Sequence, residues 1–272
     1  MHGSDLETSH GRLAYSDTGG DGMPVVMVHA NSLCKESFAP QIDALKDRYR
    51  VLAIDLLGHG ASSNAIEPRR SYSIPGYASA VEELLQGLGV LEFVGVGHSL
   101  GGHVVLEMLG SSLPIRGAFL FGTPPIENSL AGLGAGFKPS PEMAYTGSAD
   151  VSDDQIKMVV GMALGEAAAE DGFFLAAVRR TDGLARQYMV EAAVAGEGCN
   201  QRHLAETSPV PLAIINGEDD PVINLDYIDT IAYANIRSGK PIRIAGAGHG
   251  VHRERAGELN QLLSKFLTDV LV

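Results

Sequence analysis

The chain has no tryptophan, only two cysteines and fewer basic than acidic residues. Cys34 and Cys199 lie far apart and show no metal-binding spacing, so we expect two reduced thiols rather than a disulfide framework. The 20 lysine and arginine residues stand against 33 aspartate and glutamate residues, which gives a formal net charge of −13. Because such a surface repels phosphates, the composition argues against nucleic acid or an anionic membrane as a partner.

Long apolar runs are also missing, and none reaches the length of a membrane-spanning helix. Residues 1–7 have neither the basic nor the apolar region of a secretory signal. These absences predict a cytoplasmic protein and leave its oligomeric state open. The nine histidines form no H-E-x-x-H motif, and Leu100 stands where a dinucleotide-binding loop needs its last glycine. We therefore expect no metal and no other cofactor.

Short apolar runs alternate with helical patterns along most of the 272 residues. The expected strands, after an opening hairpin at 6–18, are 24–28, 51–54, 93–96, 117–121, 210–217 and 241–244. The expected helices include 38–45, 74–88, one beginning after residue 99 and one at 253–270. Near-continuous apolar strands that alternate with helices predict an α/β fold, with a mostly parallel sheet covered on both faces.

Residues 126–207 interrupt this alternation, because they contain no convincing strand pattern. They hold a glycine-rich stretch and two or three helical patterns, one of which begins at Ser152 with two aspartates in its first turn. We expect a core domain formed by residues 1–125 and 208–272. Residues 126–207 would be a helical cap inserted into it.

A G-x-S-x-G pentapeptide at residues 97–101 lies between an expected strand and an expected helix. In that context the serine, Ser99, sits on a sharp turn that presents its hydroxyl above the sheet. Glycines flank it because side chains there would collide with the neighbouring strand and helix. The spacing alone is a weak signal in a chain with 33 glycines, and the strand-to-helix context strengthens it.

A serine hydroxyl needs a base to take its proton and a third group to orient that base. Asp220 and His249 follow the expected strands at 210–217 and 241–244, in the chain order that Ser–acid–His hydrolases use. We expect Ser99 as nucleophile, His249 as base and Asp220 as the acid. Asp219 and, more remotely, Glu127 are the alternatives for the acid.

The reaction also needs two backbone N–H groups where negative charge develops on the substrate. Leu100 follows the nucleophile and supplies one of them, and the loop at 28–32 supplies the other through the main chain of Asn31. The Asn31 side chain could also contact the substrate.

These motifs together resemble the α/β-hydrolases over nearly the full length of the chain. More narrowly, the chain resembles the metal-independent N-acyl-homoserine lactonases of that fold, which hydrolyse the lactone ring of bacterial quorum-sensing signals. The stretches that carry this resemblance are 6–12, 122–125, 180–183 and 200–202. The resemblance implies a small ester or lactone with an acyl tail as substrate.

The sequence also departs from those lactonases. Ala30 replaces a glycine of the oxyanion loop, and the acid is aspartate where glutamate is expected. The cap segment 155–165 lacks the expected tyrosine, and Tyr145 and Tyr188 are the nearest substitutes. A general carboxylesterase is the alternative function, and a carbon–carbon bond hydrolase or a lactone-binding receptor is more distant.

The cap is expected to bind the acyl tail through flexible apolar side chains. The candidates for this lining, each of which could instead only pack the cap onto the sheet, are Met143, Met158, Met162, Phe173 and Phe174.

Overall fold

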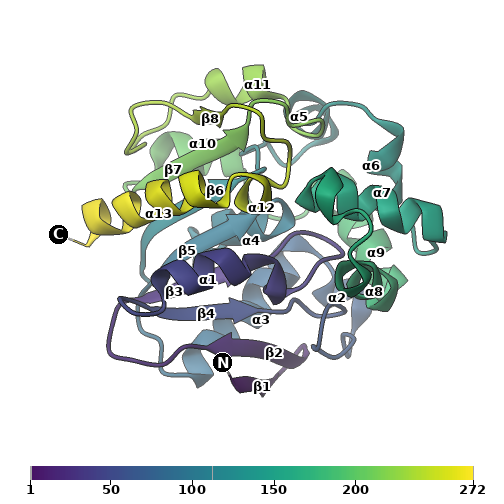
Figure 1. The fold of residues 1–272 in the computed structure, drawn as a ribbon, viewed down its shortest axis with the longest axis horizontal. Coiled ribbons are helices and arrows are strands. Elements are labelled where there is room, and N and C mark those ends of the chain that lie inside the picture. The colour runs from purple at the N-terminus through teal and green to yellow at the C-terminus, as the bar shows by residue number, and fades with distance from the viewer. Residues whose placement is uncertain (1, 112, 272) are drawn as a thin grey trace.

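The computed structural model describes residues 2–111 and 113–271, and in them an eight-stranded sheet runs in the order β1-β2-β4-β3-β5-β6-β7-β8 (Figure 1). Its strands are β1 His2–Thr8, β2 Gly11–Asp17, β3 Pro24–Val28, β4 Arg50–Ile54, β5 Phe93–His98, β6 Ile115–Phe121, β7 Leu212–Gly217 and β8 Ile242–Ile244. Strands β1 and β2 pair antiparallel with their neighbours, and the other pairs are parallel. The expected mostly parallel α/β fold is confirmed.

Helices cover both faces of this sheet. The helices of the sheet layer are α1 Ala39–Leu45, α2 Pro68–Ser71, α3 Ile74–Gly87, α4 Leu100–Met108, α11 Leu225–Asp229, α12 Val251–Glu254 and α13 Ala256–Val270, with a 3-10 turn at Lys35–Phe38. One apolar core packs α3 and α4 against the sheet, and a second packs α1 and α13 against the other face. Strand β5 is buried on both faces, which explains why its sequence is almost continuously apolar.

The segment between β6 and β7 is helical. It contains α5 Leu130–Gly136, α6 Pro141–Tyr145, α7 Asp153–Leu164, α8 Gly172–Arg180, α9 Gly183–Val194 and α10 Gln201–Thr207, with a 3-10 turn at Glu166–Ala168. Figure 1 shows α6 to α9 gathered beyond one end of the sheet. Helix α7 begins where the sequence predicts, because Ser152 and Gln155 form a capping box at its first turn. No helix among the described residues is long and apolar enough to cross a membrane.

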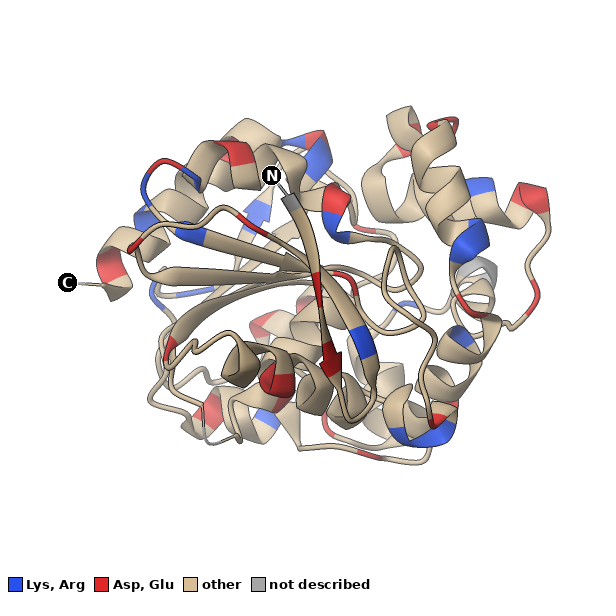
Figure 2. Cartoon of the chain, turned by 90° about the horizontal axis from the view of Figure 1, so that it is seen from below, with Lys and Arg blue, Asp and Glu red and all other residues tan. Residues whose placement is uncertain are grey.

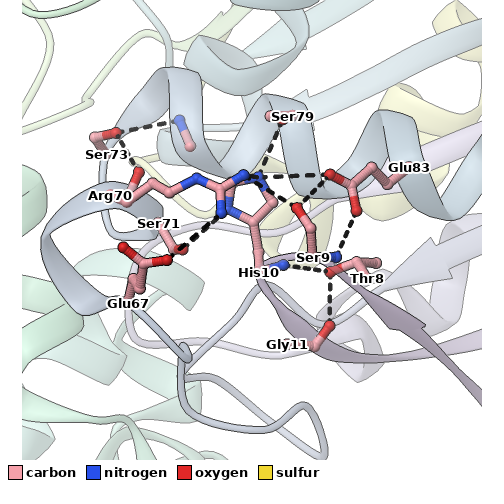
Figure 3. Close-up of polar contacts among 11 residues, drawn as sticks. Thr8, Ser9, His10, Gly11, Glu67, Arg70, Ser71, Ser73, Ser79 and Glu83 are labelled. Atoms are coloured by element: carbon pink, nitrogen blue, oxygen red, sulfur yellow. Dashed lines mark hydrogen bonds and ion pairs between the residues drawn. The ribbon is translucent and has the colours of Figure 1, made fainter.

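The opening hairpin is longer than expected, since β1 begins at His2 and the chain turns at Ser9 and His10. A polar cluster holds this turn against α2 and α3 (Figure 3). The buried His10 ring bonds to the Ser71 hydroxyl at 2.9 Å and to the Ser79 hydroxyl at 3.1 Å. Glu83 accepts two further bonds from Ser9. Strand β1 is thereby fixed at the edge of the sheet.

Acidic residues lie along the edge strand itself, where Asp5 and Glu7 are exposed (Figure 2). Charges on an edge strand discourage pairing with a strand of another chain. Elsewhere in Figure 2 the two signs of charge are spread over helices and loops. Both cysteines are free thiols, and burial raises the pKa of each.

Candidate active site

Ser99 occupies the turn between β5 and α4 in a strained conformation, with φ of 52° and ψ of −116°. A Cβ atom at Gly97 would lie 2.4 Å from the Gly102 Cα, and one at Gly101 would lie 1.9 Å from the Val28 carbonyl oxygen. Both flanking glycines are therefore required by the close approach of backbone to backbone. The turn lifts the half-buried Ser99 into a cavity.

His249 and Asp220 form a buried pair beside this cavity. The imidazole Nδ1 lies 2.8 Å from a carboxylate oxygen of Asp220, and the two side chains are 3% and 0% exposed. Gly122 leaves room for the ring, since a Cβ there would come within 2.8 Å of His249 Cε1. His249 and Ser99 both line the cavity, and no hydrogen bond joins them among the described residues. Catalytic hydrogen bonds are often formed only once substrate is bound.

The second carboxylate oxygen of Asp220 accepts the backbone N–H groups of Val222 at 2.7 Å and Ile223 at 3.1 Å. Burial raises the pKa of this carboxyl, but the opposing effects of His249 and the two N–H groups are together larger and lower it overall. Asp220 is therefore held ionised. The alternatives Asp219 and Glu127 are exposed and form no bond with His249.

The backbone N–H groups of Asn31 and Leu100 are the ones expected to form the oxyanion hole. Neither the Asn31 N–H nor the Leu100 N–H donates a hydrogen bond to any other described residue. The Asn31 side-chain amide donates to the Thr146 carbonyl in the inserted helical segment at 2.7 Å, and Asn31 also lines the cavity. Ser32 adjoins Asn31 with φ of 63°, so the two non-glycine residues with positive φ in the described chain, Ser32 and Ser99, both lie at the site.

A group of buried histidines lies behind His249. His98 Nε2 bonds to the His249 carbonyl oxygen at 3.0 Å, and the His98 ring contacts that of His252 at a centroid distance of 4.5 Å. Both nitrogens of His252 lack partners among the described residues. Burial lowers the pKa of His98 far below its usual value and that of His252 to about 3. This packing therefore supports the loop of His249 with neutral rings.

The end of α7 also packs tightly against the loop of His249. Gly165, which follows α7, has φ of 93°, and a Cβ there would lie 2.6 Å from Glu254 Cγ. A Cβ at Gly250 would lie 2.5 Å from the Leu164 carbonyl carbon. The inserted helices and the residues after His249 thus meet backbone to backbone.

The cavity has a volume of about 250 Å³, and its walls are mostly apolar. Its lining includes, besides Ser99, His249, Asn31 and Leu100, the side chains of Ile74, His103, Ile126, Leu133, Phe137, Met143, Thr146, Met162, Met189, Val190, Ala193 and Val222. Of the five residues expected to bind the acyl tail, only Met143 and Met162 line the cavity. Met158 and Phe173 face solvent, and Phe174 is buried in a separate cluster with α7.

Sequence reasoning missed the residues of α5 and α9 that line the cavity, which are Leu133, Met189, Val190 and Ala193. It also missed His103, which lies one helical turn after Ser99 and for which that spacing was an available signal. Neither Tyr145 nor Tyr188 lines the cavity, so neither replaces the expected cap tyrosine there.

The sheet order, the strained serine after β5 and the acid–histidine pair after β7 and β8 are features of a hydrolase fold. Residues 25–262 match the alpha/beta hydrolase family, and the chain belongs to that family. It is a hydrolase similar to the N-acyl homoserine lactonase AidH. AidH complexed with N-butanoyl homoserine is 38% identical, with a TM-score of 0.94, over 99% of this chain and 97% of that one. A mutant of AidH complexed with N-hexanoyl homoserine lactone gives a TM-score of 0.95 over 99% of this chain and 98% of the mutant chain.

Curated relatives match over shorter segments. An uncharacterized protein from Mycobacterium tuberculosis is 34% identical over 102 residues, which are 38% of this chain and 29% of that protein. Haloalkane dehalogenase 2 from the same organism is 32% identical over 103 residues, 38% of this chain and 35% of that protein. The match spans about a third of the length of these relatives and supports the family alone.

Proposed function

We propose that this protein opens the lactone ring of N-acyl-homoserine lactones by serine catalysis. The observation that carries the proposal is the likeness to AidH over 99% of the chain, together with a strained serine and an Asp–His pair at one apolar cavity. A cavity of about 250 Å³ suits a small molecule rather than a polymer.

In the first step, the Ser99 oxygen attacks the lactone carbonyl carbon while His249 Nε2 takes the hydroxyl proton. Asp220 holds the proton on His249 Nδ1, so that Nε2 is the free base, and stabilises the imidazolium that forms. The N–H groups of Leu100 and Asn31 bind the carbonyl oxygen as it becomes an oxyanion. Each such donor contributes about 3 kcal/mol to transition-state stabilisation.

The ring bond then breaks, and the imidazolium gives its proton to the departing ring oxygen. In a lactone this alcohol stays attached to the acyl group, so the intermediate is an ester of Ser99 that carries its own hydroxyl. Water activated by His249 attacks this ester, and the open acid leaves with Ser99 restored. Because the tethered hydroxyl could close the ring again, water must reach the ester before it does.

We further propose that residues 126–207 act as the cap that binds the acyl tail, on a core of residues 1–125 and 208–272. Helices α5, α6, α7 and α9 contribute most of the apolar cavity wall. In this assignment the core that contains the sheet carries the reacting residues, and the inserted helices bind the acyl tail.

The proposal is tested by comparing hydrolysis of an N-acyl-homoserine lactone with that of a p-nitrophenyl ester of matched chain length. The proteins are the wild type, Ser99→Ala and, as a matched control, Ser238→Ala, whose serine is exposed and is not among the residues that line the cavity. Each is assayed with and without EDTA.

Lactone opening that is insensitive to EDTA, lost in Ser99→Ala and kept in Ser238→Ala is the expected result. Ester cleavage without lactone opening would instead make the protein a carboxylesterase. Turnover of neither, with a ligand-induced rise in melting temperature, would make it a lactone-binding receptor.

A further inference from the structure

His103 places one polar atom in the wall of the cavity where the acyl tail is proposed to lie. It belongs to α4, four residues after Ser99, and its backbone N–H donates to the Ser99 carbonyl at 3.1 Å. Its ring lines the cavity beside Phe137, with the ring centroids 5.9 Å apart. Most of the surrounding wall is aliphatic or aromatic, so this imidazole is a polar exception in it.

Gln201 fixes which nitrogen of this ring carries the proton. The Gln201 Oε1 lies 2.6 Å from His103 Nδ1, and Gln201 Nε2 donates to the His103 carbonyl oxygen at 3.3 Å. If the Gln201 amide were flipped, its oxygen would face the His103 carbonyl oxygen, and two acceptors would repel each other. The two contacts together therefore place Gln201 Oε1 against His103 Nδ1. An amide oxygen accepts hydrogen bonds only, and Nδ1 is therefore the protonated nitrogen.

The other nitrogen, Nε2, is an unpaired acceptor. Burial lowers the pKa of His103 to about 4, so the ring is neutral at pH 7 and Nε2 keeps its lone pair. None of the described residues bonds to Nε2, and it is not one of their fully enclosed unpaired atoms. It is therefore open to the cavity and to what the cavity binds.

We propose that His103 Nε2 accepts a hydrogen bond from a hydroxyl group on the acyl tail, which makes the site selective for hydroxylated tails. This inference rests on the proposed lactone hydrolysis. A ketone at the same carbon has no proton to donate and would set its oxygen against the nitrogen lone pair. An unsubstituted tail would cover Nε2 without replacing its bond to water, which is unfavourable.

The spacing of Ser99 and His103 along the helix axis matches the position of the third carbon of an extended tail. Four residues of helix rise separate Ser99 from His103, which is about 6 Å. Five bonds separate the attacked ring carbonyl carbon from the third carbon of the acyl group. At about 1.2 Å of advance per bond in an extended chain, this is also about 6 Å. The 3-hydroxyacyl lactones are therefore the favoured substrates.

The experiment measures kcat/KM for three lactones of equal chain length, with 3-hydroxy, 3-oxo and unsubstituted acyl groups. We expect the wild type to prefer the 3-hydroxy lactone over the 3-oxo lactone by about tenfold or more. His103→Leu removes the acceptor and should reduce that ratio to near one. Gln201→Glu places a carboxylate beside Nδ1, favours a proton on both nitrogens and should shift the ratio toward the 3-oxo lactone.

Equal rates of the wild type on the three lactones would overturn this inference and leave the proposed function intact. The same holds if His103→Leu folds and keeps the wild-type ratio. Hydrolysis of none of the lactones would overturn both proposals. Because the comparison among lactones uses the wild type, it does not depend on the folding of either variant.

Discussion

Replacing Asp220 by asparagine keeps the shape of the side chain but exchanges the carboxylate for an amide, which changes its hydrogen bond with His249. The carboxylate accepts one bond from His249 Nδ1 at 2.8 Å on one oxygen, and two from the N–H groups of Val222 and Ile223 on the other. An amide has a single oxygen. Two N–H donors hold that oxygen on their side, so the NH2 group would face His249.

An NH2 group beside Nδ1 requires that nitrogen to be an acceptor, so the proton of the neutral ring moves to Nε2. In the proposed mechanism Nε2 takes the proton of Ser99, so a proton already on Nε2 would block the base. This change of tautomer lowers kcat by about 10⁴-fold in serine proteases, or about 5.5 kcal/mol of transition-state stabilisation. We expect a loss of the same size for Asp220→Asn.

The assay is steady-state hydrolysis of a p-nitrophenyl ester and of a lactone, with thermal unfolding to verify that each variant is folded. Asp219→Asn is the matched control, because Asp219 is exposed and its neighbour Asp220 holds the contact with His249. The control should keep wild-type activity within a few-fold. A folded Asp220→Asn within tenfold of the wild type, or an equal loss in Asp219→Asn, would refute the role given to Asp220.

Two further predictions concern stability. Burial lowers the pKa of His252 to about 3, so below pH 6.5 the unfolded chain binds a proton that the native chain does not, and stability falls as the pH falls. Between pH 7.0 and 5.5 this histidine should lower the free energy of unfolding of the wild type by about 1.2 kcal/mol. In urea unfolding, His252→Leu should therefore lose about 1.2 kcal/mol less than the wild type over the same pH range. Equal losses in the two proteins would contradict this role of His252. Gly165→Ala should lower the free energy of unfolding by about 1–3 kcal/mol, because its φ is 93° and a Cβ would lie 2.6 Å from Glu254 Cγ. Gly172→Ala, where a Cβ meets nothing within 4 Å, should be neutral or stabilising, and equal urea midpoints for the two variants would argue against this packing.

The sheet was accessible to sequence reasoning because a strand buried on both faces is almost continuously apolar. Strand β3 has the expected bounds, 24–28, and the others of the parallel region differ by a few residues at an end. The hairpin start was wrong, since β1 is an exposed edge strand with little apolar alternation. Helices α2 and α11 were missed because four or five residues are too few to show a helical period.

The positions of the proposed reacting groups were predictable for a local reason, since each follows a strand that the sequence reveals. Their catalytic roles stay predictions, although Asp220, rather than Asp219, is the residue in contact with His249. The tail-binding wall was not predictable in the same way. It depends on how short helices pack, and the bond between His103 and Gln201 joins residues 98 positions apart in the chain.

The tight contact of α7 with the residues after His249 has a consequence for how this enzyme could change over evolutionary time. Gly165 and Gly250 lie in close contact with Glu254 and Leu164, so a side chain added at either glycine would displace the loop of His249. Helix α9 lines the cavity through Met189, Val190 and Ala193 and packs against α2, α3 and α5. Under the proposed function, bulkier or smaller side chains on α9 would change the length of acyl tail that the cavity accepts without moving Ser99 or His249. The end of α7 is thus constrained by its contact with the loop of His249, whereas α9 is the part of the molecule on which new substrate preferences can be selected.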